Sequence, residues 1–180
     1  MSDFKGIFYK ETGKPDGPPV LFIHGGGGAM WTWDEVTPLL PEFRCILVDL
    51  PEHGKTGHYA GIFSIKTASA QIATLIKEII PTGKAHVVGL SVGGQMVVEM
   101  LAKTAEVLET AIISSAQLTP MFGYGLGFYS AFVMDAVYWL GIAPFKQCNP
   151  WIRLNMRYSA GIPERYFDVF RKFLTLKHGQ

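Results

Sequence analysis

Residues 89–93, Gly-Leu-Ser-Val-Gly, connect a short apolar run to a helical pattern, and this turn restricts the fold more than any other feature. The run before it is typical of a buried strand. Glycine on both sides of Ser91 removes the Cβ atoms that would collide with neighbouring backbone. The pattern predicts that Ser91 projects from the sheet edge and that a helix begins just after it, so that free N–H groups face its oxygen. Apolar residues follow at helical spacing: Val92, Met96, Val97, Met100 and Leu101.

A second apolar run, Val-Leu-Phe-Ile, leads directly into His24 and four consecutive glycines. Consecutive glycines allow backbone amides to approach a ligand oxygen closely. An oxyanion hole takes one N–H from such a loop and one from the residue after the nucleophile. We therefore expect Ser91 as nucleophile, with donors at Gly26 and Val92. Taken singly, the two segments are equally explained by a solvated serine in a glycine-rich turn and by a flexible loop.

A third strand pattern, residues 43–49, is followed by Leu-Pro-Glu-His-Gly-Lys-Thr. At this point the sequence resembles the α/β-hydrolase superfamily, in its capped members with a serine nucleophile. The matching motifs are the His-Gly loop, the Asp-x-Pro-x-His-Gly-x-Thr turn and the Gly-x-Ser-x-Gly elbow, in the family's order. The resemblance covers residues 22–116 well. It implies an α/β fold with a mostly parallel sheet flanked by helices, and it assigns His24 and Gly25 to the support of the oxyanion loop.

The family's triad runs in the order Ser, acid, His. The acid and the histidine normally follow two further strands beyond an inserted helical cap, and neither has a motif-matched counterpart here. We therefore expect a chain truncated before both, with the C-terminal strands absent. His178 is the only histidine after Ser91 in chain order, and a frayed polar tail explains it as well. Asp135 and Asp168 are possible acids, whereas Asp49 is better explained as tying down its own turn.

Two other histidines, His53 and His58, are candidates for the missing base, although the resemblance gives His53 a structural role. The resemblance also divides the chain into a hydrolase core, residues 1–116, and a helical cap, residues 117–180. Residues 121–143 are rich in Phe, Tyr, Met and Gly. Their length approaches that of a membrane span, but one aspartate and four glycines argue against a span. Such a cap would line a pocket for an acyl or hydrophobic substrate; alternatively its aromatic side chains only pack it onto the core.

Composition indicates a folded domain, with 48% hydrophobic and 17% charged residues among 180. The net charge of +1 gives no electrostatic reason to expect nucleic acid as a partner. Cys45 and Cys148 suggest reduced, unpaired thiols, and the sequence predicts neither a metal site nor a cofactor. The N-terminus has no apolar signal region, so we expect a cytoplasmic location.

Four further elements are predicted. At most one strand leads the chain, around residues 7–9. A short helix spans residues 33–40 with Val36, Leu39 and Leu40 on one face. Ser64 caps a helix that runs to Ile80, with a buried stripe of Ile65, Ala68, Ile72, Leu75, Ile76 and Ile79. The last strand, residues 110–115, becomes a sheet edge that pairs with a second copy, is covered by the cap or aggregates.

Together these patterns predict a serine hydrolase that acts on a small ester or related acyl substrate. The alternative is a catalytically silent or truncated hydrolase-fold protein that binds a hydrophobic ligand. A nucleophilic serine disfavours the superfamily's epoxide hydrolases and dehalogenases, which use aspartate there, but it does not select a substrate among the rest.

Overall fold

The computed structural model describes residues 2–56, 63–118, 136, 139–140, 143–145, 147–157, 164–168 and 171. His58, Asp135, His178 and most of residues 121–143 lie outside these ranges. The chain divides into two compact units, Met1–Leu118 and Thr119–Gln180. The division falls two residues beyond the boundary expected from the sequence.

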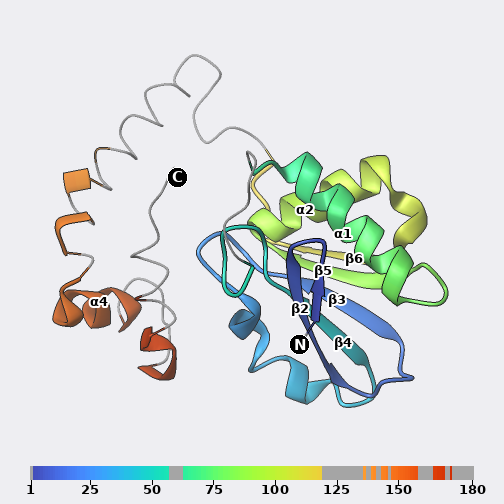
Figure 1. The fold of residues 1–180 in the computed structure, drawn as a ribbon, viewed down its shortest axis with the longest axis horizontal. Helices are drawn as coiled ribbons and strands as arrows, with labels where there is room; N and C mark the ends of the chain where they lie inside the picture. The colour runs from blue at the N-terminus through green and yellow to red at the C-terminus, as the bar shows by residue number, and fades with distance from the viewer. Residues whose placement is uncertain are drawn as a thin grey trace. The chain divides into compact units, whose positions relative to one another are not determined.

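The first unit is built on a sheet whose strand order, among the described residues, is β1-β2-β4-β3-β5-β6 (Figure 1). Four strands pair in parallel, and β2 pairs antiparallel with both β1 and β4. The mostly parallel sheet expected from the sequence is confirmed, and it brings the ends of β3, β4 and β5 to one edge. The strands are β1 (Ser2–Phe4), β2 (Ile7–Gly13), β3 (Pro19–Ile23), β4 (Arg44–Val48), β5 (Ala85–Leu90) and β6 (Leu108–Ser114).

The N-terminal strands correct the expectation of at most one leading strand. β1 and β2 form a hairpin in which Phe4 pairs with Ile7. The two residues between them, Lys5 and Gly6, have φ angles of 50° and 85°. Two successive residues with positive φ form the tight turn that matches the twist of antiparallel strands. Gly6 is the turn signal in the sequence, because glycine adopts a positive φ without strain.

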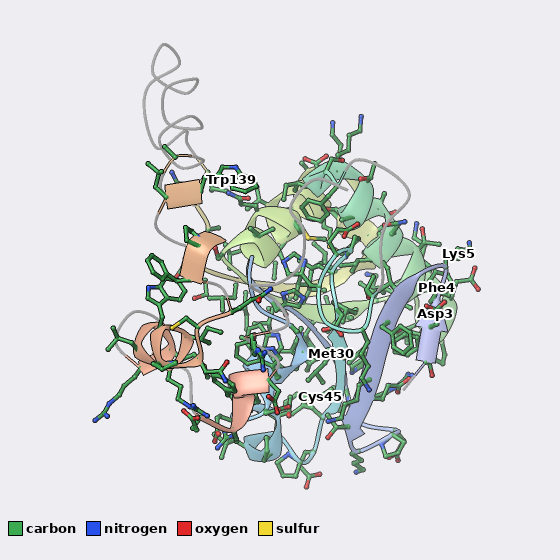
Figure 2. The ribbon with its side chains drawn as sticks, turned by 60° about the vertical axis from the view of Figure 1, so that its left-hand side comes forward. Asp3, Phe4, Lys5, Met30, Cys45 and Trp139 are labelled. Carbon is green, nitrogen blue, oxygen red and sulfur yellow. The ribbon has the colours of Figure 1, made fainter. Side chains whose placement is uncertain are left out.

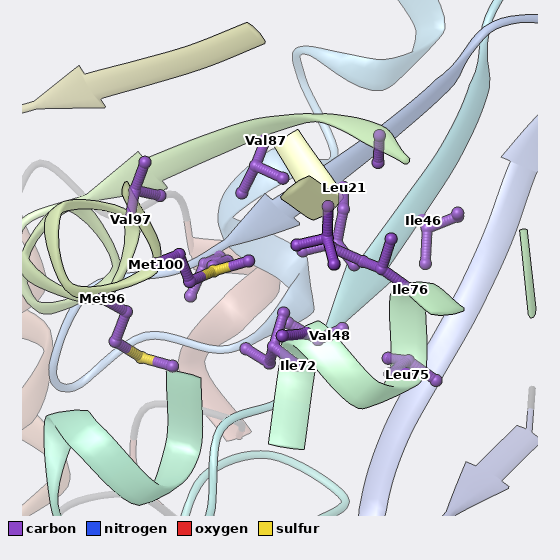
Figure 3. Packing of buried hydrophobic residues seen from close by; sticks show 14 of the residues in the cluster. Leu21, Ile46, Val48, Ile72, Leu75, Ile76, Val87, Met96, Val97 and Met100 are labelled. Carbon is purple, nitrogen blue, oxygen red and sulfur yellow. The ribbon is translucent and has the colours of Figure 1, made fainter. Parts of the chain in front are cut away.

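Two helices, α1 (Ile65–Ile79) and α2 (Val92–Lys103), pack against the sheet and each other (Figure 3). The Ser64 side chain accepts a hydrogen bond from the Thr67 N–H at 3.1 Å, which confirms the predicted cap. Alternate strand residues face these helices, as the period of a strand requires. The core on this side includes Leu21, Ile23, Ile46, Val48, Ile72, Leu75, Ile76, Val87, Met96, Val97 and Met100. Leu101, the last of the apolar residues at helical spacing, is 45% exposed.

The opposite set of strand residues forms a second cluster: Val20, Phe22, Cys45 and Leu47, with Met30 and Trp33. The last two come from the 3₁₀ turn η1 (Met30–Trp33), and Figure 2 labels Met30 in this turn and Cys45 on β4. The Phe22 and Trp33 rings lie 5.1 Å apart between centroids. Both faces of the central strands β3 and β4 are therefore covered.

The helix predicted for residues 33–40 is wrong. The segment forms η1 and a second 3₁₀ turn, η2 (Thr37–Leu39), and Leu39 is 78% exposed. Pro38 explains the difference, because it lacks an N–H and disfavours α-helical backbone at the residue before it.

The described elements of the second unit are η5 (Ala143–Phe145), α4 (Asn149–Asn155) and η7 (Glu164–Tyr166). Arg153 Nε donates to Glu164 Oε1 at 2.6 Å, so this arginine pairs within its own unit. Asp168, a candidate acid, is exposed in the same unit. Nowhere in the described ranges is a helix both long enough and apolar enough to span a membrane.

β6 lies at the edge of the sheet and pairs only with β5 among the described strands. Ile112 and Ile113, near its centre, are 52% and 41% exposed. An edge strand with exposed apolar side chains is a template for pairing with another chain. Pairing with a second copy, cover by the cap and aggregation all stay predictions for this strand, and the next experiment measures the first of them.

Replacing Ile112 by lysine is expected to weaken self-association of the 180-residue chain at least tenfold, about 1.4 kcal/mol. A charge on an edge strand opposes pairing with a second strand. Sedimentation equilibrium measures the effect, with Leu101→Lys on α2 as a control that adds the same charge elsewhere. Equal weakening by both variants would contradict an interface at β6.

Candidate active site

Ser91 occupies a strained turn between the last residue of β5, Leu90, and the first residue of α2, Val92. Its backbone φ and ψ angles are 53° and −112°. Residues other than glycine rarely adopt this conformation, which costs on the order of 1–3 kcal/mol. The turn is fixed from both sides. The Ser91 N–H donates to Ser114 O at 2.8 Å, and its carbonyl accepts from the Gln95 N–H at 3.0 Å. The side chain is exposed, as a reacting hydroxyl must be.

Glycine is required around Ser91 because backbone packs directly against backbone. A Cβ on Gly93 would overlap the carbonyl oxygen of Ile23, at the end of β3. A Cβ on Gly89 would overlap the carbonyl oxygen of Gly93. The predicted arrangement of strand, sharp turn and helix is confirmed, and the first turn of α2 lies against the end of β3.

The glycine loop, residues 25–28 after β3, lies beside the turn that contains Ser91. A Cβ on Gly25 would be 3.2 Å from the Ser91 Cβ, and one on Gly26 would be 3.3 Å from Val92 Cγ2. The Gly28 N–H closes the loop by donating to Gly25 O at 3.0 Å. The structure thus brings together the residues that the sequence singled out as nucleophile and oxyanion donors.

His24 anchors the start of the glycine loop and is fully buried. The Leu50 N–H donates to His24 Nε2 at 3.0 Å, so this nitrogen carries no proton. Nδ1 therefore carries the hydrogen and donates to Gly25 O at 2.7 Å. Burial lowers the pKa of His24 from 6.5 to about 4, and the neutral ring joins the glycine loop to the turn after β4.

Asp49 joins the same two segments through its carboxylate. Oδ1 accepts from the Met30 N–H and Oδ2 from the Lys55 N–H, each at 2.7 Å. Burial raises the pKa of Asp49, and the two N–H bonds oppose that shift. A Cβ on Gly54 would overlap the carboxylate, so the chain passes directly over it. The sequence assigned Asp49 to its own turn; its bond to Met30 had no sequence signal.

His53 also belongs to this network. Its Nε2 accepts from the Gly27 N–H at 3.3 Å, and its Nδ1 lies 2.8 Å from Pro51 O. Nδ1 must carry the hydrogen, because it faces a carbonyl. The His53 and His24 ring centroids are 5.2 Å apart. The resemblance gave His53 a structural role, but its bond to Gly27 had no sequence signal.

The described histidines do not supply a base for Ser91. His24 and His53 use both ring nitrogens to hold the loops. His86 pairs with Val20 near the start of β5, at the end of the strand away from Ser91. Within the ranges that the structure describes, no group of three or more His, Cys, Asp or Glu side chains is arranged to hold a metal ion.

The site occurs in a segment that matches a known family. Residues 18–138 match the model of the alpha/beta hydrolase fold. A protein of Gibberella zeae described as an AB hydrolase superfamily protein is 34% identical over 131 residues, 67% of this chain and 46% of that protein. An esterase of Mycobacterium tuberculosis is 34% identical over 97 residues, 53% of this chain and 32% of the esterase.

A solved hydrolase of Pseudomonas aeruginosa shares the fold, with a TM-score of 0.69 and 17% identity over 95% of this chain and 63% of the hydrolase. The chain belongs to the α/β-hydrolase family. The matches cover less than half of either sequence relative, 46% and 32% of their lengths.

Acid should weaken the fold through His24. Because its folded-state pKa lies below its unfolded value, its contribution to stability is complete above about pH 6.5 and is lost as the pH falls toward about 4. The loss should reach roughly 3 kcal/mol. Urea unfolding across this pH range, compared with His24→Gln, isolates the contribution, and His86→Gln serves as control. An unchanged pH dependence in His24→Gln would contradict it.

Proposed function

We propose that this chain carries the nucleophile and oxyanion hole of a serine hydrolase that acts on a small ester or related acyl substrate. One observation supports the proposal most strongly. Ser91 sits on a strained turn with its side chain exposed, while Gly25 and Gly26 pack against Ser91 and Val92. Strain of this kind occurs where a side chain must be aimed for chemistry. The relative described as an esterase agrees with this reaction class.

In the proposed reaction the Ser91 hydroxyl attacks the substrate carbonyl, and its proton passes through a base to the leaving alcohol. The Gly26 and Val92 N–H groups donate to the oxyanion of the tetrahedral intermediate. The N-terminal end of α2 adds positive potential at the same place. Water then attacks the acyl-enzyme, releases the acid and returns the proton to Ser91.

The hydrogen bonds of the glycine loop support Gly26 as the donor. Three amides that follow Gly26 donate hydrogen bonds within the protein. The Gly27 N–H donates to His53, the Gly28 N–H to the Gly25 carbonyl, and the Met30 N–H to Asp49. Each of these N–H groups is already directed at a protein acceptor. Gly26 packs on Val92, the residue that carries the other proposed donor.

The proposal keeps the helical cap that the sequence predicts in residues 117–180. The base and acid would come from residues not identified here. A catalytically silent hydrolase-fold protein that binds a hydrophobic ligand is the second candidate, since both ring nitrogens of His24 and His53 are used in the loops. A serine without its histidine loses about 10⁴- to 10⁶-fold in rate.

A fluorophosphonate probe is expected to label the chain at Ser91, because the oxyanion hole also stabilises the transition state of phosphonylation. Ser91→Ala should abolish labelling. Ser115→Ala is the matched control, since Ser115 is also exposed and also has a φ of 53°. Mass spectrometry of the labelled peptide identifies the site.

Turnover of p-nitrophenyl acetate separates the two candidates. Repeated turnover that depends on Ser91 would show that a base is present, whereas labelling without turnover would support the silent protein. Labelling that persists in a folded Ser91→Ala variant would contradict the assignment of the nucleophile.

A further inference from the structure

The glycine loop is held by two histidines that bond in the same way. Each accepts a backbone N–H at Nε2, from Leu50 in His24 and from Gly27 in His53. Each places Nδ1 against a carbonyl, that of Gly25 or of Pro51. The two rings differ in exposure: His24 is fully buried, whereas His53 is half-buried and open to protons from solvent.

We propose that His53 is a positioning residue for the oxyanion loop, and that protonation of its ring releases the Gly27 amide and loosens the loop. Gly27 follows Gly26, so the bond to His53 also fixes the peptide that orients the proposed donor. The effect on catalysis rests on the function proposed above. The hydrogen bond between His53 and Gly27, and the dependence of that bond on pH, are independent of the proposed function.

The chemistry follows from the number of acceptors on an imidazole ring. A neutral ring has one donor and one acceptor nitrogen, and in His53 the acceptor is occupied by the Gly27 N–H. A protonated ring has hydrogens on both nitrogens, so the Nε2 hydrogen would face the Gly27 hydrogen. The bond must then break. Gly27 has a φ of 78°, which glycine adopts without strain, so its peptide can turn away.

The charges around His53 come from both packed segments. On the glycine loop lies His24, whose pKa is lowered by burial to about 4, so that its ring is neutral above that pH. Just after β4 lies Asp49, whose pKa is raised by burial, and its electrostatic interaction with His53 opposes that rise. The turn of His53 itself contains Glu52 and Lys55. The His24 anchor is therefore kept down to about pH 4, whereas we propose that the His53 anchor is released at higher pH.

The Gly27 amide reports the bond directly. In the 180-residue chain, its chemical shift and hydrogen-exchange protection are measured by NMR from about pH 8 to about pH 5, together with the ring signals of His53. The amide is expected to shift with the same midpoint as the His53 ring. Its protection should fall about fivefold beyond the intrinsic pH effect, as for one lost hydrogen bond.

Two variants separate a missing bond from a misfolded chain. His53→Gln keeps an oxygen near the position of Nε2 but does not titrate, so the Gly27 amide should stay protected at every pH. His53→Phe removes the acceptor, so the amide should be exposed at every pH. His86→Gln is the matched control and should behave as the unmodified chain.

A Gly27 amide that ignores the His53 titration, or that titrates unchanged in His53→Gln, would overturn the proposal. Fluorophosphonate labelling of Ser91 adds a second test. The labelling rate should fall with the Gly27 transition in the unmodified chain and lose that step in His53→Gln. A labelling rate that keeps the step in His53→Gln would overturn the positioning role. If Ser91 is not labelled at all, the proposed function fails, and the amide measurement still decides the pH-dependent bond.

Discussion

The candidate site depends on the two hydrogen bonds that the buried Asp49 carboxylate accepts from backbone N–H groups. Parallel strands bring the ends of β3 and β4 to one edge, but the loops that leave them have no regular partner for their N–H groups. Asp49 satisfies one N–H from each segment, at Met30 and Lys55. A charge-assisted bond in a buried setting is stronger than a neutral one, so a single side chain fixes both loops.

His24 and Thr56 extend this arrangement. His24 links the glycine loop to the Leu50 amide, and Thr56 Oγ1 donates to the Asp49 carbonyl and accepts from the Phe8 N–H. The turn after β4 is thereby joined to β2 as well as to the loop after β3. The glycine loop, which has the least intrinsic preference for one conformation, is held by its own bond from Gly28 to Gly25 and by the side chains of His24, Asp49 and His53.

The sequence predicted the parts of the fold that local rules control. Ser64 and the apolar stripe of α1 follow from capping and periodicity, and the glycines around Ser91 follow from the need for close backbone contact. The sequence-based prediction failed where one or two residues changed the local backbone conformation. Pro38 divides the predicted helix into two 3₁₀ turns, and Lys5 with Gly6 adds a hairpin.

The residues of the candidate site were predicted better than the bonds between them. Ser91, Gly25 and Gly26 were found because their motif encodes a backbone shape. The Met30 N–H donates to Asp49, 19 positions away in the sequence. The Gly27 N–H donates to His53, 26 positions away. Such pairings depend on which strand ends lie side by side, and no local pattern contains that information.

The backbone at position 91 favours a different amino acid from the one it carries. With φ at 53°, glycine would fit there without steric cost, and replacing the serine by glycine would be expected to relieve strain on the order of 1 kcal/mol. The hydroxyl is therefore maintained against the local preference of the chain. A chain with glycine at position 91 would therefore gain stability and lose the proposed nucleophile.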